Sequence, residues 1–187
     1  MNDDGLMHYN TVDTLKSLTL WEYARSDLQE TFCSEILDTL SIIRSKIRSL
    51  DGIQKSRKMQ CVYLHYNRSL QDISDLRHVK KTLKALRIEN CPKIEDFSVL
   101  GELENLELLE LSGSNELPSL VFIKSMKNLK TFCFSVNIQD GDLTPCLALT
   151  YAFSERNHKH YNLKDKDLPK GNFIHGNESI EVWRRTE

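Results

Sequence analysis

Apolar residues recur along the middle of the chain with one fixed, long period. Three segments are apolar at their first, fourth and sixth positions and polar afterwards: LKALRIENC from Leu83, LELLELSGS from Leu106 and LKTFCFSVN from Leu129. Their starts are evenly spaced along the sequence. A constant period of roughly 20–50 residues is typical of a solenoid, in which every repeat is one unit of a stacked array.

The same template extends towards the N-terminus. It also fits segments that begin at Leu15, Leu37 and Met59, so six copies follow one another at a nearly constant interval. All 18 template positions in the six copies are apolar. Because so short a unit cannot bury its own apolar face, we expect the strands to stack in parallel around one shared core.

The segments between the strands carry a second apolar set. Spacings of three and four recur there, as in Leu70, Ile73 and Leu76. Such spacings favour a turn or two of helix, either α or 3₁₀. We therefore expect each return segment to cover the side of the core opposite the strands.

These residues resemble the leucine-rich repeat family, whose pattern is L-x-x-L-x-L-x-x-N/C-x-L with one strand per repeat. The resemblance covers about residues 15–157. It implies an α/β fold: a leucine-rich repeat solenoid, a right-handed horseshoe with a parallel β-sheet on the concave face and short helices or 3₁₀ turns on the convex face. It also implies a protein that binds another protein on the concave face without catalysis of its own.

The ninth template position is informative in this family, since an Asn or Cys there faces inward and satisfies buried backbone groups. The matching residues are Asn67, Cys91 and Asn137, whereas Tyr23, Ser45 and Ser114 depart from the pattern.

We expect two parts in the chain. Residues 1–157 would form a leucine-rich repeat domain of about six to seven repeats, each of about 22–24 residues, and residues 158–187 a C-terminal cap and tail. The segment LALTYAFSERN predicts the last strand, with Ala148, Tyr151 and Phe153 inward. Few residues precede the first repeat, so either MHYN forms a short cap strand, or the chain belongs to a longer array, or another molecule covers that end.

Charge and cysteine content limit the kinds of binding partner and the cellular compartment that we expect. The formal net charge is −2 with both signs mixed along the chain, which predicts no nucleic-acid or membrane partner. The N-terminus has acidic residues where a signal peptide needs basic ones, and no apolar run is long enough to span a membrane. Five cysteines without metal-ligand spacing indicate reduced thiols and a cytoplasmic protein.

No sequence motif indicates catalysis, a cofactor, a metal or a small-molecule substrate. His158 and His160 alternate in an extended segment but have no third ligand nearby, so a solvated loop or cap is the better interpretation than a metal site. Cys61 and His65 are four residues apart on one strand, about 13 Å, which is too far for a nucleophile and its base. We therefore predict that the chain is not an enzyme.

The candidate binding residues are those that strand alternation and the following turn place on the concave face and its rim. Trp, Tyr and Arg, which dominate binding hot spots, gather in the first four repeats, and two acidic residues could complement a basic partner. The predicted protein-binding residues are Trp21, Arg44, Tyr63, His65, Tyr66, Arg87, Glu89 and Glu110. The alternative is that the aromatic residues only pack across neighbouring strands.

The tail FSERNHKHYNLKDKD is similar to the ends of short bacterial leucine-rich repeat proteins, a group associated with toxin and immunity loci. This resemblance implies a cytosolic immunity protein that neutralises a cognate toxin domain by covering its active surface. Two alternatives remain: a scaffold or regulatory adaptor subunit of an enzyme complex, and an enzyme whose chemistry lies in the C-terminal tail around His158 and His160.

Overall fold

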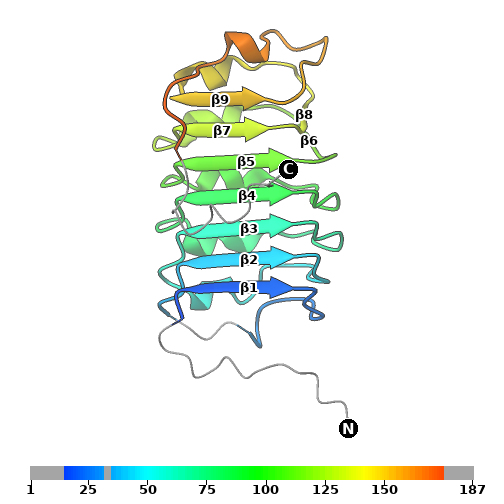
Figure 1. Cartoon of the computed structure of the whole chain (residues 1–187), viewed down its shortest axis with the longest axis vertical. Coiled ribbons are helices and arrows are strands. Elements are labelled where there is room, and N and C mark those ends of the chain that lie inside the picture. Colours follow the sequence, from blue (N-terminus) through cyan, green and yellow to red (C-terminus); the bar gives the residue numbers. More distant parts are fainter. Residues whose placement is uncertain (1–14, 32–34, 175–187) are drawn as a thin grey trace, which may run out of the picture.

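The computed structural model describes residues 15–31 and 35–174, and their strands form one parallel sheet with a second, two-stranded sheet beside it (Figure 1). The main sheet has seven strands, which lie in the order in which they occur in the sequence. Two further, short strands form the second sheet. Its strands are β1 (Ser17–Trp21), β2 (Thr39–Ile43), β3 (Cys61–His65), β4 (Ala85–Glu89), β5 (Leu108–Ser112), β7 (Thr131–Phe134) and β9 (Tyr151–Ser154).

The strands of the main sheet follow the period of the sequence, which shortens only before β9. Each pairs in parallel with the next at the register of the repeat, so that Leu40 lies beside Val62 and Leu86 beside Leu109. The predicted solenoid of parallel strands is thus confirmed, and the architecture is that of a leucine-rich repeat. The small sheet pairs β6 (Glu116–Leu117) with β8 (Asn137–Ile138).

The return segments contain short 3₁₀ helices behind the sheet (Figure 1). They are η2 (Ile53–Lys55), η3 (Ser74–Val79), η4 (Ser98–Glu102), η5 (Val121–Ser125) and η6 (Thr144–Ala148). A further 3₁₀ helix, η7 (Asp165–Asp167), follows β9. A return of this length has room for only one or two tight turns, which favours 3₁₀ over α geometry. Their apolar residues, such as Leu76, Leu100 and Ile123, meet the inward side chains of the strands in one continuous core.

A three-residue motif, Asp, apolar, Ser or Thr, begins several of these returns. The Asp72 carboxylate accepts a hydrogen bond from the Ser74 backbone N–H at 2.8 Å, and Asp96 does the same for Ser98. In the third instance Asp142 accepts from Thr144. Aspartate readily closes such a turn two residues ahead, so the sequence itself starts these three 3₁₀ helices while the central apolar residue enters the core.

Inward polar side chains satisfy the backbone where each strand ends. The Asn67 side chain accepts from the Ser45 N–H at 2.9 Å and donates to the Ile42 carbonyl at 2.8 Å. Cys91 donates its thiol to the Leu64 carbonyl, so the expectation for Asn67 and Cys91 is confirmed. Ser45 departs from the Asn/Cys pattern but has the same role, since its hydroxyl accepts from the Tyr23 N–H at 3.0 Å.

The inward position shifts in the fifth repeat. Asn115, not Ser114, is buried there and donates to the carbonyls of Cys91 and Ile94. The match at Asn137 is wrong, because its side chain donates to Glu116 at the surface of the small sheet. Gly113, with φ of 129°, stands at the eighth template position, so the shift by one residue begins after it.

The last strand is present, but its predicted inward side chains are wrong by one position. Ala152 and Ser154 face the core, whereas Phe153 is 39% exposed and Tyr151 lies on the opposite face. The register pairs Ala152 with Phe132 and Ser154 with Phe134. The two Phe rings, stacked at 4.8 Å, fill the core beneath β9 and leave room only for small partners.

Residues after β9 close this end of the core. Tyr161 is buried, accepts a hydrogen bond from the Ile138 N–H at 3.0 Å and donates to the Val136 carbonyl. Leu168 is also buried in the core. The expected arrangements at the N-terminal end, including a cap strand of MHYN, lie outside the described residues.

Candidate functional site

The candidate surface is the face of the sheet opposite the 3₁₀ helices, here called the concave face. In β1, Ser17, Thr19 and Trp21 are exposed on it while the residues between them are buried. The parallel register aligns such positions into three rows across the sheet. The first row is Ser17, Thr39, Cys61, Ala85, Leu108, Thr131 and Tyr151; the second is Thr19, Ser41, Tyr63, Arg87, Glu110, Cys133 and Phe153; the third is Trp21, Ile43, His65, Glu89 and Ser112.

The N-terminal end of this face carries an open patch, defined as Trp21, Arg44 and Tyr66. Trp21 is 51% exposed and Tyr66 is 38% exposed. The guanidinium carbon of Arg44 lies 5.9 Å from the centroid of the Trp21 ring, within the range of a cation–π contact. An exposed indole is therefore held in place by a cation that is itself open to solvent.

The backbone turns sharply at the eighth template position, where the strands end. Glu22, Arg44, Tyr66 and Asn90 all have φ between 50° and 57°, in the left-handed region. A side chain in this conformation costs about 1 kcal/mol relative to glycine. Arginine and tyrosine thus stand at rim positions where glycine would fit with less strain, and strain of this kind often accompanies function.

Two ion pairs bridge neighbouring strands in the centre of the face. His65 Nδ1 lies 3.0 Å from Glu89 Oε2, and Arg87 Nε lies 3.0 Å from Glu110 Oε2. All four side chains are roughly a quarter to a third exposed. Burial raises the pKa of Glu110, against the opposing effect of the nearby Arg87 guanidinium.

Tyr63 differs from the expectation of an open binding residue. It is only 1% exposed, beneath the Arg87 guanidinium, whose carbon lies 5.5 Å from the ring centroid. With Cys61, Ala85 and Leu108 it forms an apolar group on the concave face, here called the concave cluster. The sequence places Tyr63 on the correct face but does not show that it is covered.

The covering residues come from the C-terminal end of the described chain. Residues 169–174, here called the C-terminal strap, turn back beside β9 and pass the starts of the strands (Figure 1). Phe173 packs against the concave cluster and meets the Tyr151 ring edge-on at 5.2 Å. Sequence reasoning missed the strap. The one sequence feature that could have indicated the strap is the composition of the first row. That row is polar at Ser17 and Thr39 and apolar at the residues of the concave cluster.

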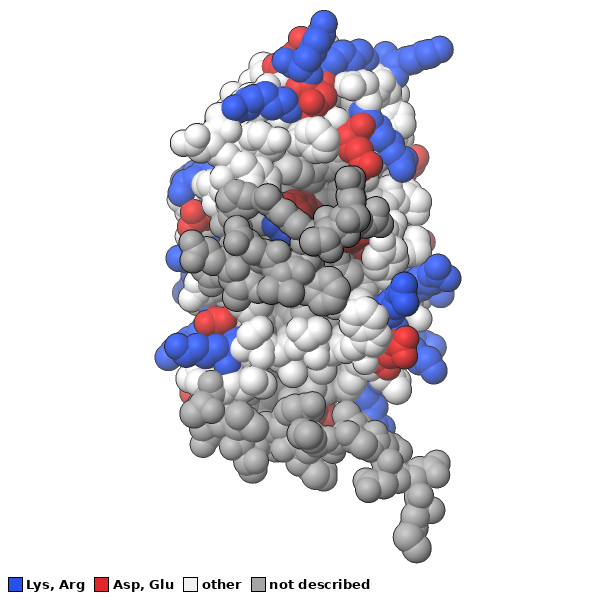
Figure 2. All heavy atoms as spheres, in the orientation of Figure 1, with Lys and Arg blue, Asp and Glu red and all other residues white. Residues whose placement is uncertain are grey.

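Charged side chains lie mainly along the two edges of the concave face, while uncharged residues occupy much of its visible middle (Figure 2). At the edge where the strands begin, a groove of about 510 Å³ is lined by three lysines, Lys58, Lys81 and Lys84, and by Glu107. Glu107 pairs with Lys130 at 2.9 Å. This edge is therefore basic, but its side chains are solvated and form no enclosed site.

Three of the described cysteines have the opposite of nucleophilic character. Burial raises the pKa of Cys91 to about 11 and of Cys133 and Cys146 to about 12. A reactive cysteine needs a lowered pKa. These thiols therefore act as small packing groups. None of the described residues form a group of three or more His, Cys, Asp or Glu able to hold a metal ion.

The paired histidines of the tail belong to the packing around Tyr161. His160 Nε2 donates to the Ile138 carbonyl at 2.9 Å, and the His158 and His160 rings lie 5.6 Å apart. Both rings also contact Tyr161. They are structural neighbours of the buried tyrosine, which accounts for their clustering without a ligand.

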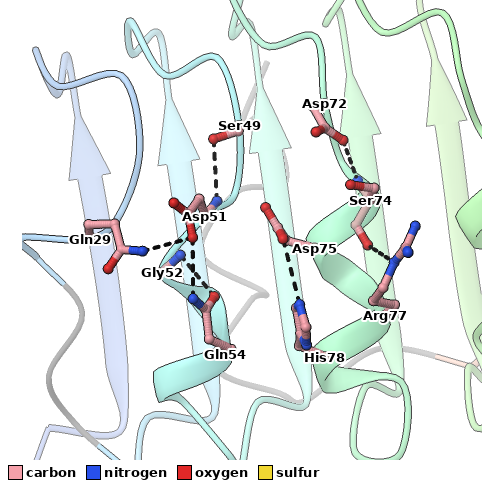
Figure 3. A network of polar contacts seen from close by, with 10 residues as sticks. All are labelled: Gln29, Ser49, Asp51, Gly52, Gln54, Asp72, Ser74, Asp75, Arg77 and His78. Carbon is pink, nitrogen blue, oxygen red and sulfur yellow. Dashed lines mark hydrogen bonds and ion pairs between the residues drawn. The ribbon is translucent and has the colours of Figure 1, made fainter.

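Polar contacts join the return segments of the first and second repeats, and a second set of contacts lies within the return of the third repeat (Figure 3). Asp51 accepts hydrogen bonds from Gln29 and Gln54, which lower the pKa of its carboxyl group. Burial, together with the neighbouring Asp51 and Asp72, raises the pKa of Asp75, whose carboxylate lies 3.7 Å from His78. Gly52 permits this packing, because an added Cβ would meet the Leu28 carbonyl carbon at 2.5 Å. The hydrogen bond between Gln29 and Asp51 therefore links the first two repeats on the return side.

No known protein family matches the sequence, and no curated protein matches it. Among solved structures, the chain is similar to an internalin (InlF) from Listeria monocytogenes str. 4b F2365, with a TM-score of 0.47 and 16% identity. The match covers 89% of this chain and 63% of that one, so the chain spans less than two thirds of its length. The class of the protein, a leucine-rich repeat solenoid, is defined by the strand period and register described above.

Within the described residues, no helix is both long enough and apolar enough to cross a bilayer.

Proposed function

We propose that the chain is a non-catalytic protein-binding module and that its docking surface is the concave face. The open patch carries this proposal. It combines a half-exposed tryptophan, an arginine stacked on it and an exposed tyrosine. Such residues supply most of the energy at protein interfaces, because each desolvates a large area and keeps a polar group for hydrogen bonding.

The two ion pairs beside the open patch would set specificity. His65 with Glu89, and Arg87 with Glu110, present alternating charge on rigid strands. Their positions are already fixed in the free chain, so little conformational entropy is lost when a partner binds. A partner with complementary charges would find both pairs preorganised.

The narrower proposal is a cytoplasmic immunity protein that binds and neutralises a toxin domain. It is supported by the similarity of the FSERNHKHYNLKDKD tail to short bacterial leucine-rich repeat proteins, and by a rigid face large enough to cover an active site. Growth rescue tests it directly. Each neighbouring gene product is expressed with and without this chain, and we expect one of them to be toxic alone and harmless with the chain.

A matched control separates binding from mere expression. The Trp21→Ala variant should lose rescue, whereas a Val121→Ala variant on the return side should keep it. If no neighbouring gene product is toxic, or if rescue survives the loss of Trp21 and Arg44 together, the immunity proposal fails.

A scaffold or adaptor remains the second candidate, because a scaffold needs two docking surfaces. Val121 and Leu147 are 57% and 49% exposed on the return side. A groove of about 390 Å³, lined in part by Ile123, Met126 and Pro145, lies between η5 and η6. Two proteins captured together, one released by Trp21→Ala and the other by Leu147→Ala, would favour the adaptor over the inhibitor.

A further inference from the structure

The open groove of about 510 Å³ at the edge where the strands begin, here called the basic groove, carries an excess of positive charge. Its charged lining residues are Lys58, Lys81, Lys84 and Glu107. All three lysines are exposed. The chain as a whole has a formal net charge of −2, so this positive charge is local and opposes the overall balance.

The lysines of the basic groove lack anionic partners. The one acidic residue that lines the groove, Glu107, already pairs with Lys130 at 2.9 Å. Within the part of the chain that the structure describes, no ion pair or side-chain hydrogen bond involves Lys58, Lys81 or Lys84. Three unpaired ammonium groups thus share one groove, where their combined field favours an incoming anion.

The asparagines that line the basic groove hold its backbone in place. The Asn105 side-chain amide donates to the Lys81 carbonyl at 2.8 Å, and the Asn128 amide donates to the Glu104 carbonyl at 2.9 Å. Asn128 also donates to Asn105 Oδ1 at 3.2 Å. These bonds join successive repeats, so the backbone that carries the lysines is fixed before a ligand arrives, which lowers the entropic cost of binding.

The basic groove crosses the starts of three neighbouring strands. Gln60, Lys84 and Glu107 line it and directly precede β3, β4 and β5. The Lys84 N–H donates to the Gln60 carbonyl and the Glu107 N–H donates to the Lys84 carbonyl, both at 2.8 Å. Because neighbouring strands are about 4.8 Å apart, an extended segment laid along the groove meets one repeat after another. The groove also adjoins the first row of the concave face.

We propose that the basic groove binds an extended acidic segment of the protein partner, whose Asp and Glu carboxylates pair with Lys58, Lys81 and Lys84. The inference rests on the proposed function, since it adds a second contact, with its own chemistry, beside the concave face. Exposed charges are screened by salt, so this contact should be strongest at low ionic strength.

Carboxylates fit the basic groove better than the phosphates of a nucleic acid. Among the described residues that line it, none is an arginine, whose planar guanidinium suits bidentate contacts with phosphate. None is aromatic, so the groove offers no ring on which bases could stack. The negative net charge of the chain also repels a long polyanion. A short acidic segment needs only point charges, which lysines supply.

A fluorescein-labelled peptide of six glutamates tests the proposal on the full chain. Its affinity is measured by fluorescence anisotropy at about 50 mM NaCl, where screening is weak. The triple variant Lys58→Gln, Lys81→Gln and Lys84→Gln should bind the peptide about 5-fold or more weakly, because each exposed ion pair contributes modestly. A labelled peptide of six glutamines should not bind the wild-type chain.

A second triple variant controls for net charge. Lys93, Lys159 and Lys166 are exposed and lie outside the basic groove. Their joint replacement by Gln changes the net charge by the same amount and should alter the affinity by less than about 2-fold. Unchanged affinity in the groove variant would overturn the proposal. Equal losses in the two triple variants would also overturn it, because the peptide would then respond only to net charge.

A labelled oligothymidylate of six nucleotides distinguishes the two kinds of anion. It should bind the wild-type chain more weakly than the six-glutamate peptide does. Equal or tighter binding of the oligonucleotide would overturn the acidic segment as the occupant and favour a nucleic acid. All these measurements use the chain without its partner, so their failure would leave the proposed role of the open patch standing.

Discussion

The N-terminal end and the centre of the concave face are built on the same repeated strand yet present different surfaces. At β1 to β3 the third row and the rim expose Trp21 and Tyr66. At β3 to β5, in the centre, the first row is apolar and lies under Phe173. The backbone register is the same in both regions, so the difference lies in the side chains and in the reach of the C-terminal strap. One scaffold thus carries an immediately accessible surface and a covered one.

The largest expected loss of stability distinguishes the main core from the concave cluster. Leu108 and Leu109 are neighbours on β5 that point to opposite faces, and both are buried. Leu109→Ala should lower the free energy of unfolding by about 3 kcal/mol, because the core of a stacked sheet cannot collapse onto the cavity. Leu108→Ala should cost about 1 kcal/mol, since the strap can settle into the space. Urea denaturation measures both, and equal losses would contradict the distinction.

The next largest loss of stability should come from the inward polar side chains that end the strands in both regions. Asn67→Ala removes an inward amide that bridges Ser45 and Ile42 and leaves their backbone groups buried without partners. We expect a loss of about 2 kcal/mol. Asn128→Ala is the matched control on the exposed edge and should cost less than about 0.5 kcal/mol. Thermal unfolding of the two variants checks the difference.

Glu110 should make the centre of the face sensitive to pH. Because burial raises the pKa of its carboxyl group in the folded chain, the stability it contributes is present below the unfolded pKa and is lost as the pH rises through the folded pKa. Relative to Glu110→Gln, the wild-type chain should therefore become less stable as the pH rises from about 4 to 8. Urea midpoints at each pH provide the measurement.

Asp142 is a control of the opposite sign. Hydrogen bonds from Thr144 lower the pKa of its carboxyl group, so its contribution is present above the unfolded pKa and is lost as the pH falls. Relative to Asp142→Asn, the wild-type chain should gain stability as the pH rises. Parallel profiles for the two variants would mean that burial does not govern the titration of Glu110.

The smallest expected effect concerns the strained rim. Glu22 has φ of 52° without taking part in the open patch. Glu22→Gly should raise the free energy of unfolding by about 0.5 kcal/mol, since relief of the left-handed strain exceeds the added freedom of the unfolded chain. A thermal melt would show the gain. A loss of stability would mean that the side chain makes contacts that outweigh the strain.

The strands and their register were predictable because the period of the apolar residues directly reports the stacking. Each of the six template copies contains one strand, which starts at the third position of the copy. In the third copy, for example, the template begins at Met59 and the strand at Cys61. The seventh strand was also foreseen, but its inward side was not. Its facing is decided by the bulk of Phe132 and Phe134 on the strand beneath, which no local pattern in β9 reveals.

The candidate site was predictable only where exposure follows from strand alternation. Trp21, Arg44 and Tyr66 lie on the face or rim as expected, and the pairing of His65 with Glu89 follows from the register. The burial of Tyr63 was not predictable, because Phe173 packs against its cluster from a distant part of the sequence, in a segment without a repeat pattern. Contacts between a repeat array and an irregular tail are set by tertiary packing, which periodicity does not encode.

The central claim is that the concave face, and not the return side, binds the protein partner. The most direct measurement compares the partner's affinity for two double variants by titration calorimetry: Trp21→Ala with Arg44→Ala, and Val121→Ala with Leu147→Ala. We expect the first to weaken binding by about 30-fold or more and the second by less than about 2-fold. The reverse order, or equal losses, would contradict the claim.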